Sequence, residues 1–599
     1  MDSPQFQSLR STMQATVVSV AHVGDVVASG GVIAVVESMK MEHGIVAAVS
    51  GTVTSVAVEV GEAVREGTIL MQVRVGEVSA PKVSAEAVPA SPRLQELRDR
   101  AALLLDEARP DAVKKRHERG LRTARENLND LLDADSYIEY GRFAYAAQSS
   151  RRPVEELIAK TPADGLVSGI GTVEGRPVAA LSYDATVLAG TQGQRNHHKK
   201  DRLLDLVARQ LIPLVFFTEG GGGRPGDTDI PVVTGLNTTA FAAFAKLSGR
   251  VPTIGIAAGR CFAGNAALLG CCDIAIGVEG ASIGMGGPAM IEGGGLGTVS
   301  AEEVGPLPVH VAAGSIDLVA SDEADAVVLT KQLLAFAQRV VVPGVAAPAS
   351  LLETVLPSDR RRAYSVHSVL DVLFDSGSVI EIRGGFGRAM VTGFARLEGR
   401  PVAVLANNPA HNAGAIDADA ADKAAHFFQL AESWGLPIVS LVDTPGFMVG
   451  PEAETTGLVR HISRMFVASA ALTVPFVALI TRRGYGLGAQ AMCGGSFTEP
   501  LLTVAWPEAE LGGMGLEGAV RLGFRTELEA IANEDLRAQA FEHMVAAAYE
   551  HGRSLNVAAH LELDDVIDPL DTRSILGQTI DRALLNYERP SHSRFVDPF

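Results

Sequence analysis

Several features that would assign this chain to a familiar class are missing from its sequence. No run of about 18 apolar residues occurs, which argues against a transmembrane helix. The N-terminus lacks the basic segment and apolar stretch of a secretory signal. There is no CxxC pair for a zinc ribbon, so we expect buried thiols in a reducing cytoplasm at the four cysteines, Cys261, Cys271, Cys272 and Cys493.

Positive charge is also scarce. The formal net charge is −19, which argues against a sequence-independent nucleic-acid binder. The chain has 599 residues, 47% of them hydrophobic and 20% charged, an ordinary globular mixture. That length predicts about three or four domains.

A short duplication lies near the N-terminus. Residues 23–36 match residues 60–73, and the segments before them, 16–21 and 52–57, match as well. Each copy alternates apolar and polar residues and is punctuated by Gly-Asp or Gly-Glu turns, a pattern typical of short antiparallel strands. The repeat predicts a small all-β sandwich, in which Lys40 stands at the tip of a hairpin between the two halves.

The hairpin reads "VVESMKMEHG", and a solvated turn lysine is the simplest interpretation of Lys40. Residues 12–75, however, resemble the biotinyl domain of biotin-dependent carboxylases, in which the modified lysine lies in a Met-Lys-Met turn. The resemblance implies that biotin is attached to Lys40 and that a biotin protein ligase recognises Glu37, Met39 and Met41. After this domain, residues 76–91 are rich in Ala, Pro, Ser and Val and predict a flexible linker.

A larger duplication organises the rest of the chain. Residues 168–181 match residues 392–405, with Gly393 as the counterpart of Gly169. Pro213 and Pro437 stand at the same offset from each other as these two glycines. Apolar strands alternate with amphipathic helical stretches in both copies, which predicts two α/β halves of βαβ type. We place their boundaries at 92–342 and 343–599.

In each half a strand runs into a glycine-rich turn and then a helix, at 259–270 and at 482–495. A second turn, at 218–227 and at 443–450, is expected to line the same cleft, and it includes Gly222 and Gly223. Such turns are often mere close packing. N–H groups at a helix start can also form an oxyanion hole, which needs no charged side chain.

Residues 92–599 resemble the carboxyltransferase subunit of acyl-CoA carboxylases, built from two crotonase-type halves. The motifs "GTQG" (190–193), "CFAGNAA" (261–267), "DTPGF" (443–447), "ITRRGYGLGA" (480–489) and "AWPEAELGGMG" (505–515) carry the match. The resemblance implies one oxyanion hole for the thioester oxygen and one for the biotin ureido oxygen. It places them at Ala263 with Gly264 and at Leu487 with Gly488, and it makes Gln490 the residue that tunes acyl length.

The implied activity is carboxyl transfer from carboxybiotin to the α-carbon of an acyl-CoA. The second-half hole assists release of CO2, the freed ureido nitrogen takes the α-proton, and the first-half hole holds the enolate. No metal is expected. Within 194–202 a basic run offers Arg195, Lys199, Lys200 and Arg202 to the phosphates of CoA.

No P-loop occurs, so we expect a separate biotin carboxylase subunit to supply ATP-dependent chemistry. The resemblance also implies a homohexameric core and a place in fatty acid metabolism. Two alternatives remain open: a biotin-dependent decarboxylase or transcarboxylase subunit, and a carrier or scaffold whose halves have lost activity.

Overall fold

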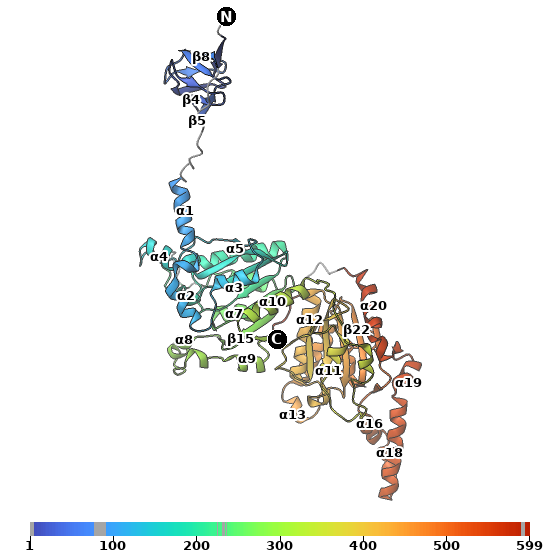
Figure 1. Cartoon of the computed structure of the whole chain (residues 1–599). Coiled ribbons are helices and arrows are strands. Elements are labelled where there is room, and N and C mark those ends of the chain that lie inside the picture. Colours follow the sequence, from blue (N-terminus) through green and yellow to red (C-terminus); the bar gives the residue numbers. More distant parts are fainter. Residues whose placement is uncertain (1–4, 77–90, 225, 230–233, 235, 589–593) are drawn as a thin grey trace. The chain divides into compact units, whose positions relative to one another are not determined.

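The computed structural model of the protein describes residues 5–76, 91–224, 226–229, 234, 236–588 and 594–599. The chain divides into two compact units, Met1–Gln95 and Glu96–Phe599 (Figure 1). The predicted linker, 76–91, lies outside the described residues except at its two ends. No helix within the described ranges combines the length and the apolar character that crossing a lipid bilayer requires.

The first unit is an all-β sandwich of two four-stranded sheets, as the short duplication predicts. Their strand orders are β1-β8-β6-β3 and β5-β4-β2-β7. Buried Val, Ile and Leu side chains from both sheets form one core between them. The strands are β1 (Phe6–Arg10), β2 (Ala15–Val20), β3 (Val26–Val27), β4 (Val32–Ser38), β5 (Met41–Val46), β6 (Gly51–Val56), β7 (Ala63–Val64) and β8 (Ile69–Val75).

The second unit contains two larger sheets, one for each half of the long duplication. The first sheet has the order β17-β15-β13-β12-β11-β10-β9, and its central pairs are parallel. A separate pair, β14 with β16, carries the turn that precedes helix α7. These strands are β9 (Ile138–Glu139), β10 (Leu166–Val173), β11 (Arg176–Tyr183), β12 (Leu214–Phe217), β13 (Thr253–Ala257), β14 (Arg260–Phe262), β15 (Ile274–Val278), β16 (Ser282–Gly284) and β17 (Leu318–Ala320).

The second sheet repeats this plan in the order β18-β19-β20-β21-β22-β23-β25, with β24 paired to β22. Parallel strands buried on both faces read as continuous apolar runs, which is why the sequence indicates them. These strands are β18 (Ile380–Ile382), β19 (Met390–Leu397), β20 (Arg400–Asn407), β21 (Ile438–Thr444), β22 (Phe476–Tyr485), β23 (Leu502–Ala505), β24 (Glu510–Gly512) and β25 (Asp565–Val566).

Helices cover both sheets, and one of them, α18, extends away from the body as a single rod (Figure 1). No residue of α18 is buried. The helices of the first half are α1 (Pro92–Ala102), α2 (Pro110–His117), α3 (Ala124–Leu131), α4 (Val154–Lys160), α5 (Gln194–Gln210), α6 (Ala240–Ala245), α7 (Gly264–Gly270), α8 (Pro288–Gly293), α9 (Leu307–Ala312) and α10 (Glu323–Ala337). Those of the second half are α11 (His367–Leu373), α12 (Ala418–Trp434), α13 (Pro451–Glu454), α14 (Leu458–Ser469), α15 (Gly486–Met492), α16 (Leu516–Gly523), α17 (Arg525–Ala530), α18 (Glu534–His551), α19 (Ser554–Ala559) and α20 (Thr572–Leu584).

Helices α5 and α12 show how closely the two halves agree. Both have 17 residues, and every residue of one has its counterpart in the other at the same constant offset along the chain. Both end in a left-handed residue, Leu211 with φ 54° and Gly435 with φ 68°. A left-handed cap is a common way to end a helix, and the second half uses glycine, which adopts it without strain. The predicted duplication is therefore confirmed.

The two halves share a buried contact centred on Trp434, at the end of α12. Its indole ring stacks on Phe394 at 4.9 Å, and its Nε1–H donates to Oδ2 of Asp273 in the first half at 3.1 Å. Burial raises the pKa of Asp273 to about 7, against the effect of the hydrogen bonds from Trp434 and Thr253. Because this carboxyl group lies in the protein interior, each donor that it loses leaves an unsatisfied buried acceptor.

We expect Trp434→Phe to destabilise the second unit. The ring stacking is retained, but at pH 8, above the pKa of Asp273, a bond to a carboxylate is lost, at a cost of about 1.5–3 kcal/mol. Urea denaturation measures the loss. Trp506→Phe is the matched control, because Nε1–H of Trp506 donates to the neutral hydroxyl of Thr572 at 2.9 Å. Equal losses in both variants would contradict a special role for the Asp273 contact.

Candidate functional site

Lys40 stands at the tip of the hairpin between β4 and β5. The strands pair up to Ser38 and Met41, so Met39 and Lys40 form a two-residue turn, with φ values of 53° and 66°. Two left-handed residues are typical of the tight turn that matches the twist of a hairpin. The Met39 side chain is 96% exposed, and Lys40 and Glu37 are exposed as well. The primary amine is therefore fully presented to an enzyme that would modify it.

In the first half the two glycine turns pack directly against each other. The N–H of Gly220 donates to the Arg260 carbonyl at 2.7 Å, and the N–H of Phe262 donates back to the Gly220 carbonyl at 3.0 Å. A Cβ on Gly222 would lie 2.7 Å from Cβ of Ala263, so only glycine allows this approach. The structure thus brings Gly220 and Gly222 against the residues that precede α7, as expected.

The backbone of this turn corrects one half of the predicted donor pair. Ala263 has φ 51°, and its N–H already donates to the Gly284 carbonyl at 2.9 Å, so Ala263 is not available as a donor. Gly264 opens α7, where no intrahelical acceptor exists. Within the described part of the chain, the N–H groups of Gly264, Gly222 and Gly223 donate to no protein acceptor.

The second half repeats this arrangement. The N–H of Ile416 donates to the Gly446 carbonyl, as the N–H of Gln192 does to Gly222 in the first half. A Cβ on Gly488 would lie 2.7 Å from the backbone of Gly446, so the turn at 443–450 packs under the start of α15. Leu487 and Gly488 occupy the second and third positions of α15, where a helix offers their N–H groups no acceptor of its own.

Side chains around this second turn differ in exposure. Leu487 is 60% exposed, and Gln490 is exposed one helical turn further along α15. A cavity of about 320 Å³ lies beside the turn and is lined by Pro445, Arg483 and Tyr485 among others. The cavity thus adjoins the residues that precede α15, while Gly488 itself is buried.

The basic run at 194–202 is not the surface patch that the sequence suggested. Lys199 and Lys200 are buried, because the same helix face that carries the leucines of α5 also carries these two side chains. Nζ of Lys199 donates to the Ala163 carbonyl at 3.0 Å and to the Leu166 carbonyl. Both ammonium groups are thus occupied inside the protein, which corrects their expected contact with CoA phosphates.

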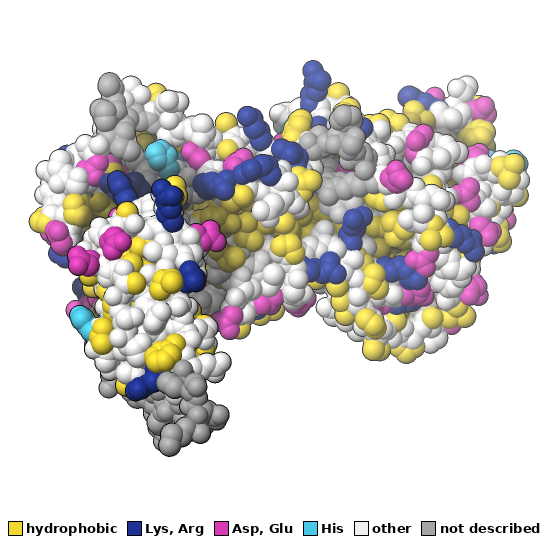
Figure 2. Space-filling model, turned by 90° about the horizontal axis from the view of Figure 1, so that it is seen from above, with side chains coloured by type: hydrophobic (Ala, Val, Ile, Leu, Met, Phe, Trp, Pro, Cys, Tyr) yellow, Lys and Arg dark blue, Asp and Glu magenta, His cyan; other side chains and the backbone are white. Residues whose placement is uncertain are grey.

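Arg195 is also engaged. Its guanidinium lies 4.2 Å from the centre of the Tyr145 ring and donates to Asp229 at 3.1 Å. Arg202 remains exposed and pairs with Asp205 on its own helix. On the face drawn in Figure 2, Lys and Arg side chains alternate with acidic and apolar ones.

Lys199 has a twin in the second half, Lys423, at the equivalent position of α12. Nζ of Lys423 donates to the Phe386 and Met390 carbonyls at 3.1 and 2.8 Å. Burial lowers the pKa of both lysines to about 8. The two halves therefore share a buried lysine that donates hydrogen bonds to two backbone carbonyls.

The sequence analysis missed one charged cluster at the second cleft. Asp443 accepts from Nε of Arg482 at 2.9 Å and from Nε of Arg483 at 2.6 Å. Arg482 is buried over the ring of Tyr364, and both arginines contribute to the wall of the cavity. The available signal was an aspartate that ends one parallel strand, beside an Arg-Arg pair on the next strand.

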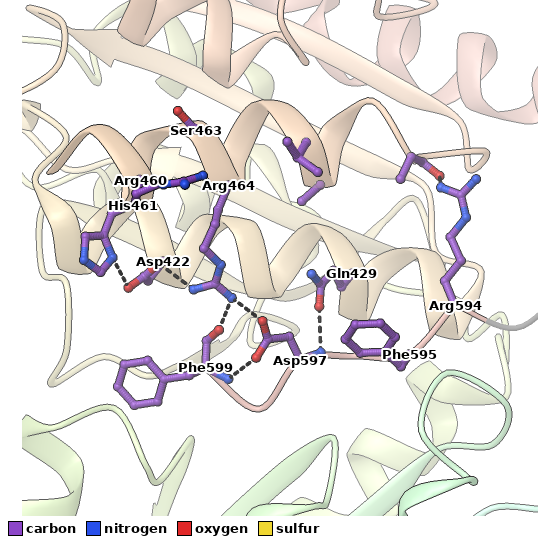
Figure 3. Close-up of a pocket in the computed structure, with 13 residues that line it drawn as sticks. Asp422, Gln429, Arg460, His461, Ser463, Arg464, Arg594, Phe595, Asp597 and Phe599 are labelled. Atoms are coloured by element: carbon purple, nitrogen blue, oxygen red, sulfur yellow. Dashed lines mark hydrogen bonds and ion pairs between the residues drawn. The ribbon is translucent and has the colours of Figure 1, made fainter. Parts of the chain in front are cut away.

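Another cavity, of about 970 Å³, contains none of the predicted site residues. It lies between α14, α12 and the C-terminal segment (Figure 3). Arg464 donates to Asp422 at 2.5 Å and to Asp597 at 2.9 Å, so its charge is neutralised within the wall. The C-terminal segment also bonds Ser248 of the first half through Val596, which makes this cavity part of a structural clamp.

Comparison with known proteins assigns these elements. Residues 115–594 match the carboxyl transferase domain family, and residues 7–73 match the biotin-requiring enzyme family. This chain belongs to the carboxyl transferase family. The all-β first unit is accordingly a biotin-requiring domain, so the predicted biotin cofactor is confirmed.

Relatives of this carboxyltransferase cover most of its length. It is 35% identical to the methylmalonyl-CoA carboxyltransferase 12S subunit of Propionibacterium freudenreichii subsp. shermanii, over 78% of this chain and 90% of that protein. It is 33% identical to the biotin-dependent acetyl-/propionyl-coenzyme A carboxylase beta5 subunit of Mycobacterium tuberculosis (strain ATCC 25618 / H37Rv), over 82% of this chain and 91% of that protein.

Two solved structures are similar to the carboxyltransferase. A single-chain, multi-domain long-chain acyl-CoA carboxylase gives a TM-score of 0.78 at 48% identity, covering 97% of this chain and 58% of that one. This chain therefore spans little more than half of that multi-domain protein. The transcarboxylase 12S hexamer with methylmalonyl-CoA and methylmalonic acid bound gives a TM-score of 0.75 at 33% identity, covering 85% of this chain and 99% of that one.

These findings confirm an enzyme of the acyl-CoA carboxylase type that carries its own biotin domain and transfers a carboxyl group. Three points stay predictions. They are the positions of the donors, the domain boundaries at 12–75, 92–342 and 343–599, and the recognition of Glu37, Met39 and Met41 by a ligase.

We expect Lys40→Arg to abolish biotinylation while leaving the fold intact. Arginine keeps the positive charge at the hairpin tip, but its guanidinium is not the primary amine that the ligase acylates. A streptavidin blot measures the modification. Lys115→Arg, a replacement of another exposed lysine, is the matched control and should stay positive. A positive blot from the Lys40 variant would overturn the assignment.

Proposed function

We propose that the two halves of this carboxyltransferase divide the transfer between biotin on Lys40 and the α-carbon of an acyl-CoA. One observation carries the proposal: each half ends a strand in a glycine turn that packs under a helix start with unpaired N–H groups. Donors of this kind stabilise an oxygen that gains negative charge, without help from an acidic or basic side chain.

The hairpin tip suits a covalently attached biotin, because the Lys40 amine is exposed and held in a fixed turn. When it is bound there, biotin supplies a transferable carboxyl group and a basic ureido nitrogen. The chain's own contribution is to present that group at the end of a rigid domain, and its free backbone donors orient the two oxygens that change charge.

In the first half, we assign the N–H of Gly264 to the thioester oxygen of the acyl-CoA. Gly222 and Gly223, whose N–H groups are also unpaired, lie beside it and are candidate substrate contacts. In the second half, we assign the N–H groups of Leu487 and Gly488 to the ureido oxygen. Preorganised donors act in a water-poor cleft, where each is worth more than it would be in water.

We propose the class of the substrate, an acyl-CoA thioester, and no particular acyl group. The relatives act on methylmalonyl-CoA, on acetyl- and propionyl-CoA and on long-chain acyl-CoA, and all of these are thioesters of CoA. Gln490 lies exposed on α15, where it can limit the length of the acyl chain. Arg202 is the exposed cation of the basic run that we retain for the CoA phosphates, together with Arg195.

The partners follow from the same comparison. We assign biotin carboxylase activity to a separate subunit, because the sequence offers no P-loop. The hexameric 12S neighbour supports a homohexameric core of crotonase-type halves. We further propose a cytoplasmic location, modification by a biotin protein ligase and a role in fatty acid metabolism.

A transcarboxylase is the second candidate, because the 12S subunit is 35% identical over 78% of the chain. It uses the same turns with a second carboxylated thioester as donor. Copurification distinguishes the two candidates. A carboxylase should copurify with a biotin carboxylase subunit. A transcarboxylase should lack that subunit and should transfer the carboxyl group between two acyl-CoA thioesters.

The thioester donor is tested with Gly264→Pro and Gly264→Ala. Both add a Cβ, but only proline removes the N–H, and proline is well tolerated at the first position of a helix. We expect Gly264→Pro to transfer the carboxyl group from biotin to acetyl-CoA or propionyl-CoA about 100- to 1,000-fold more slowly than Gly264→Ala. Release of CO2 from carboxylated biotin should stay the same in the two variants.

The matching pair in the second half is Leu487→Pro and Leu487→Ala. Proline does not fit at Gly488, because its Cβ would meet the backbone of Gly446 at 2.7 Å. In Leu487→Pro both CO2 release and carboxyl transfer should fall, because CO2 release depends on the N–H of Leu487 and transfer requires CO2. Equal damage to both steps by both proline variants would show that the halves do not divide the reaction.

We also expect the 599-residue chain by itself to show no bicarbonate-dependent turnover of ATP, because its sequence offers no P-loop. ADP release measured with the biotinylated chain, with and without an added biotin carboxylase, tests this. ADP production by the chain alone would reveal a nucleotide site that the sequence analysis missed.

A further inference from the structure

A buried polar network lies directly behind Gly264. Lys200, on α5, is fully buried, and its Nζ donates to Oη of Tyr183 at 3.0 Å and to Oε1 of Gln192 at 3.1 Å. Nε2 of Gln192 donates in turn to Oδ1 of Asn265 at 3.1 Å. Asn265 follows Gly264 in the first turn of α7, so the network runs from the middle of α5 to the proposed donor.

Gln192 is the member of the network that lies beside Gly264. A Cβ on Gly264 would lie 2.9 Å from Nε2 of Gln192 and 3.1 Å from the ring of Phe241. The backbone of Gln192 also receives the N–H of Arg224 and donates to the Gly222 carbonyl. Gln192 therefore bonds one glycine turn through its backbone and the first turn of α7 through its side chain.

The second half does not contain this network. The positions that correspond to Gln192 and Lys200 hold Ile416 and Ala424, which are both fully buried and apolar. The counterpart of Asn265 is Gly488, because the helix-start motifs of the two halves align these two residues. Lys199, by contrast, has its equivalent in Lys423. The polar network is therefore a feature of the first half alone, added to a shared scaffold.

We propose that Lys200 is a positioning residue for the thioester side of the reaction: acting through Gln192, it fixes the N–H of Gly264 and places a positive charge behind it. This inference rests on the proposed function, since it gives a role to that same turn. A buried cation is favoured when negative charge develops nearby, and the protein interior screens the attraction weakly. It would thus act most strongly in the transition state that forms the enolate.

The charge of Lys200 depends on pH near neutrality. Burial lowers its pKa to about 7, and Asp201 opposes that shift. Three titratable groups interact with it directly: Asp201 and His197 on its own helix, and Tyr183 on β11. Around these, Arg224 of the glycine turn acts on both His197 and Tyr183, His198 acts on His197, and Asp164 and Cys261 act on Tyr183. Burial lowers the pKa of His197 to about 4, so this imidazole is neutral near pH 7. We therefore expect the assistance from Lys200 to fade as the pH rises above about 7.

The test compares Lys200→Met with Lys199→Met in the full-length chain. The probe is the reverse transfer from malonyl-CoA or methylmalonyl-CoA to free biotin, which needs no partner subunit. We expect Lys200→Met to lower kcat about 10- to 100-fold, with little change in KM, and to lose the fall in kcat above about pH 7. Lys199→Met removes the donor to two backbone carbonyls that lie away from the turn. Whatever activity this variant retains should still fall above about pH 7.

A second measurement does not depend on activity. Unfolded lysine binds a proton below its ordinary pKa of 10.5, whereas Lys200 in the folded protein binds one only below about 7. The unfolded state therefore holds more protons between pH 7 and 10.5, and stability rises with pH across that window. Urea denaturation at pH 7 and pH 9.5 should show a smaller rise in Lys200→Met than in the natural chain.

Gln192→Met gives an independent variant if Lys200→Met folds poorly. It cuts the link to Asn265 and keeps the lysine, so we expect a similar loss of kcat. Equal kcat values and pH profiles in the Lys199 and Lys200 variants would overturn the proposal. The proposed function would still stand in that case, provided that the natural chain transfers the carboxyl group. Failure of the natural chain to transfer it from either thioester would overturn the proposed function first, and the inference with it.

Discussion

Close approach of two backbone turns is the constraint on which the site depends. In each half a glycine turn at the end of one strand lies under the start of a short helix, at distances that no side chain would permit. A Cβ at Gly222 or at Gly488 would meet its neighbour at 2.7 Å. The contact holds the helix start rigidly, and rigidity is what makes a backbone N–H an effective donor to a charged oxygen. The sheet and the long helix of each half serve to hold that contact in place.

Gene duplication explains the scaffold, and differences between the copies explain the chemistry. The two long helices, α5 and α12, have the same length and lie at a constant offset along the chain. Each contributes a buried lysine, Lys199 or Lys423, whose ammonium group donates to two backbone carbonyls. Such shared features maintain the fold. Features present in one half alone, such as Lys200 behind the first turn, are where we expect the two reactions to differ.

Much of this could be predicted from the sequence, because the relevant signals were periodic or repeated. The alternating strands around Lys40 and the constant offset between the long repeats indicated the sandwich and the two α/β halves, and the glycine turns pointed to the cleft. Side-chain direction could not be predicted in the same way. The basic run suggested a charged surface, but Lys199 and Lys200 lie on the buried face of α5. The engagement of the Ala263 N–H by Gly284 depends on a strand pair that no local pattern reveals.

Charge is also placed differently in the two clefts. In the first half the cation lies behind the turn, buried and held by an amide, so it can strengthen a donor without touching the substrate. In the second half Asp443 holds Arg482 and Arg483, which both line the cavity beside the turn. A thioester oxygen must be stabilised while the neighbouring carbon stays reactive, which favours a remote charge. A carboxyl group that arrives from solvent on a tethered domain is more easily met by a cation at the cleft wall. The two halves of one scaffold thus set their positive charge at different depths, behind the turn in the first and at the cavity wall in the second.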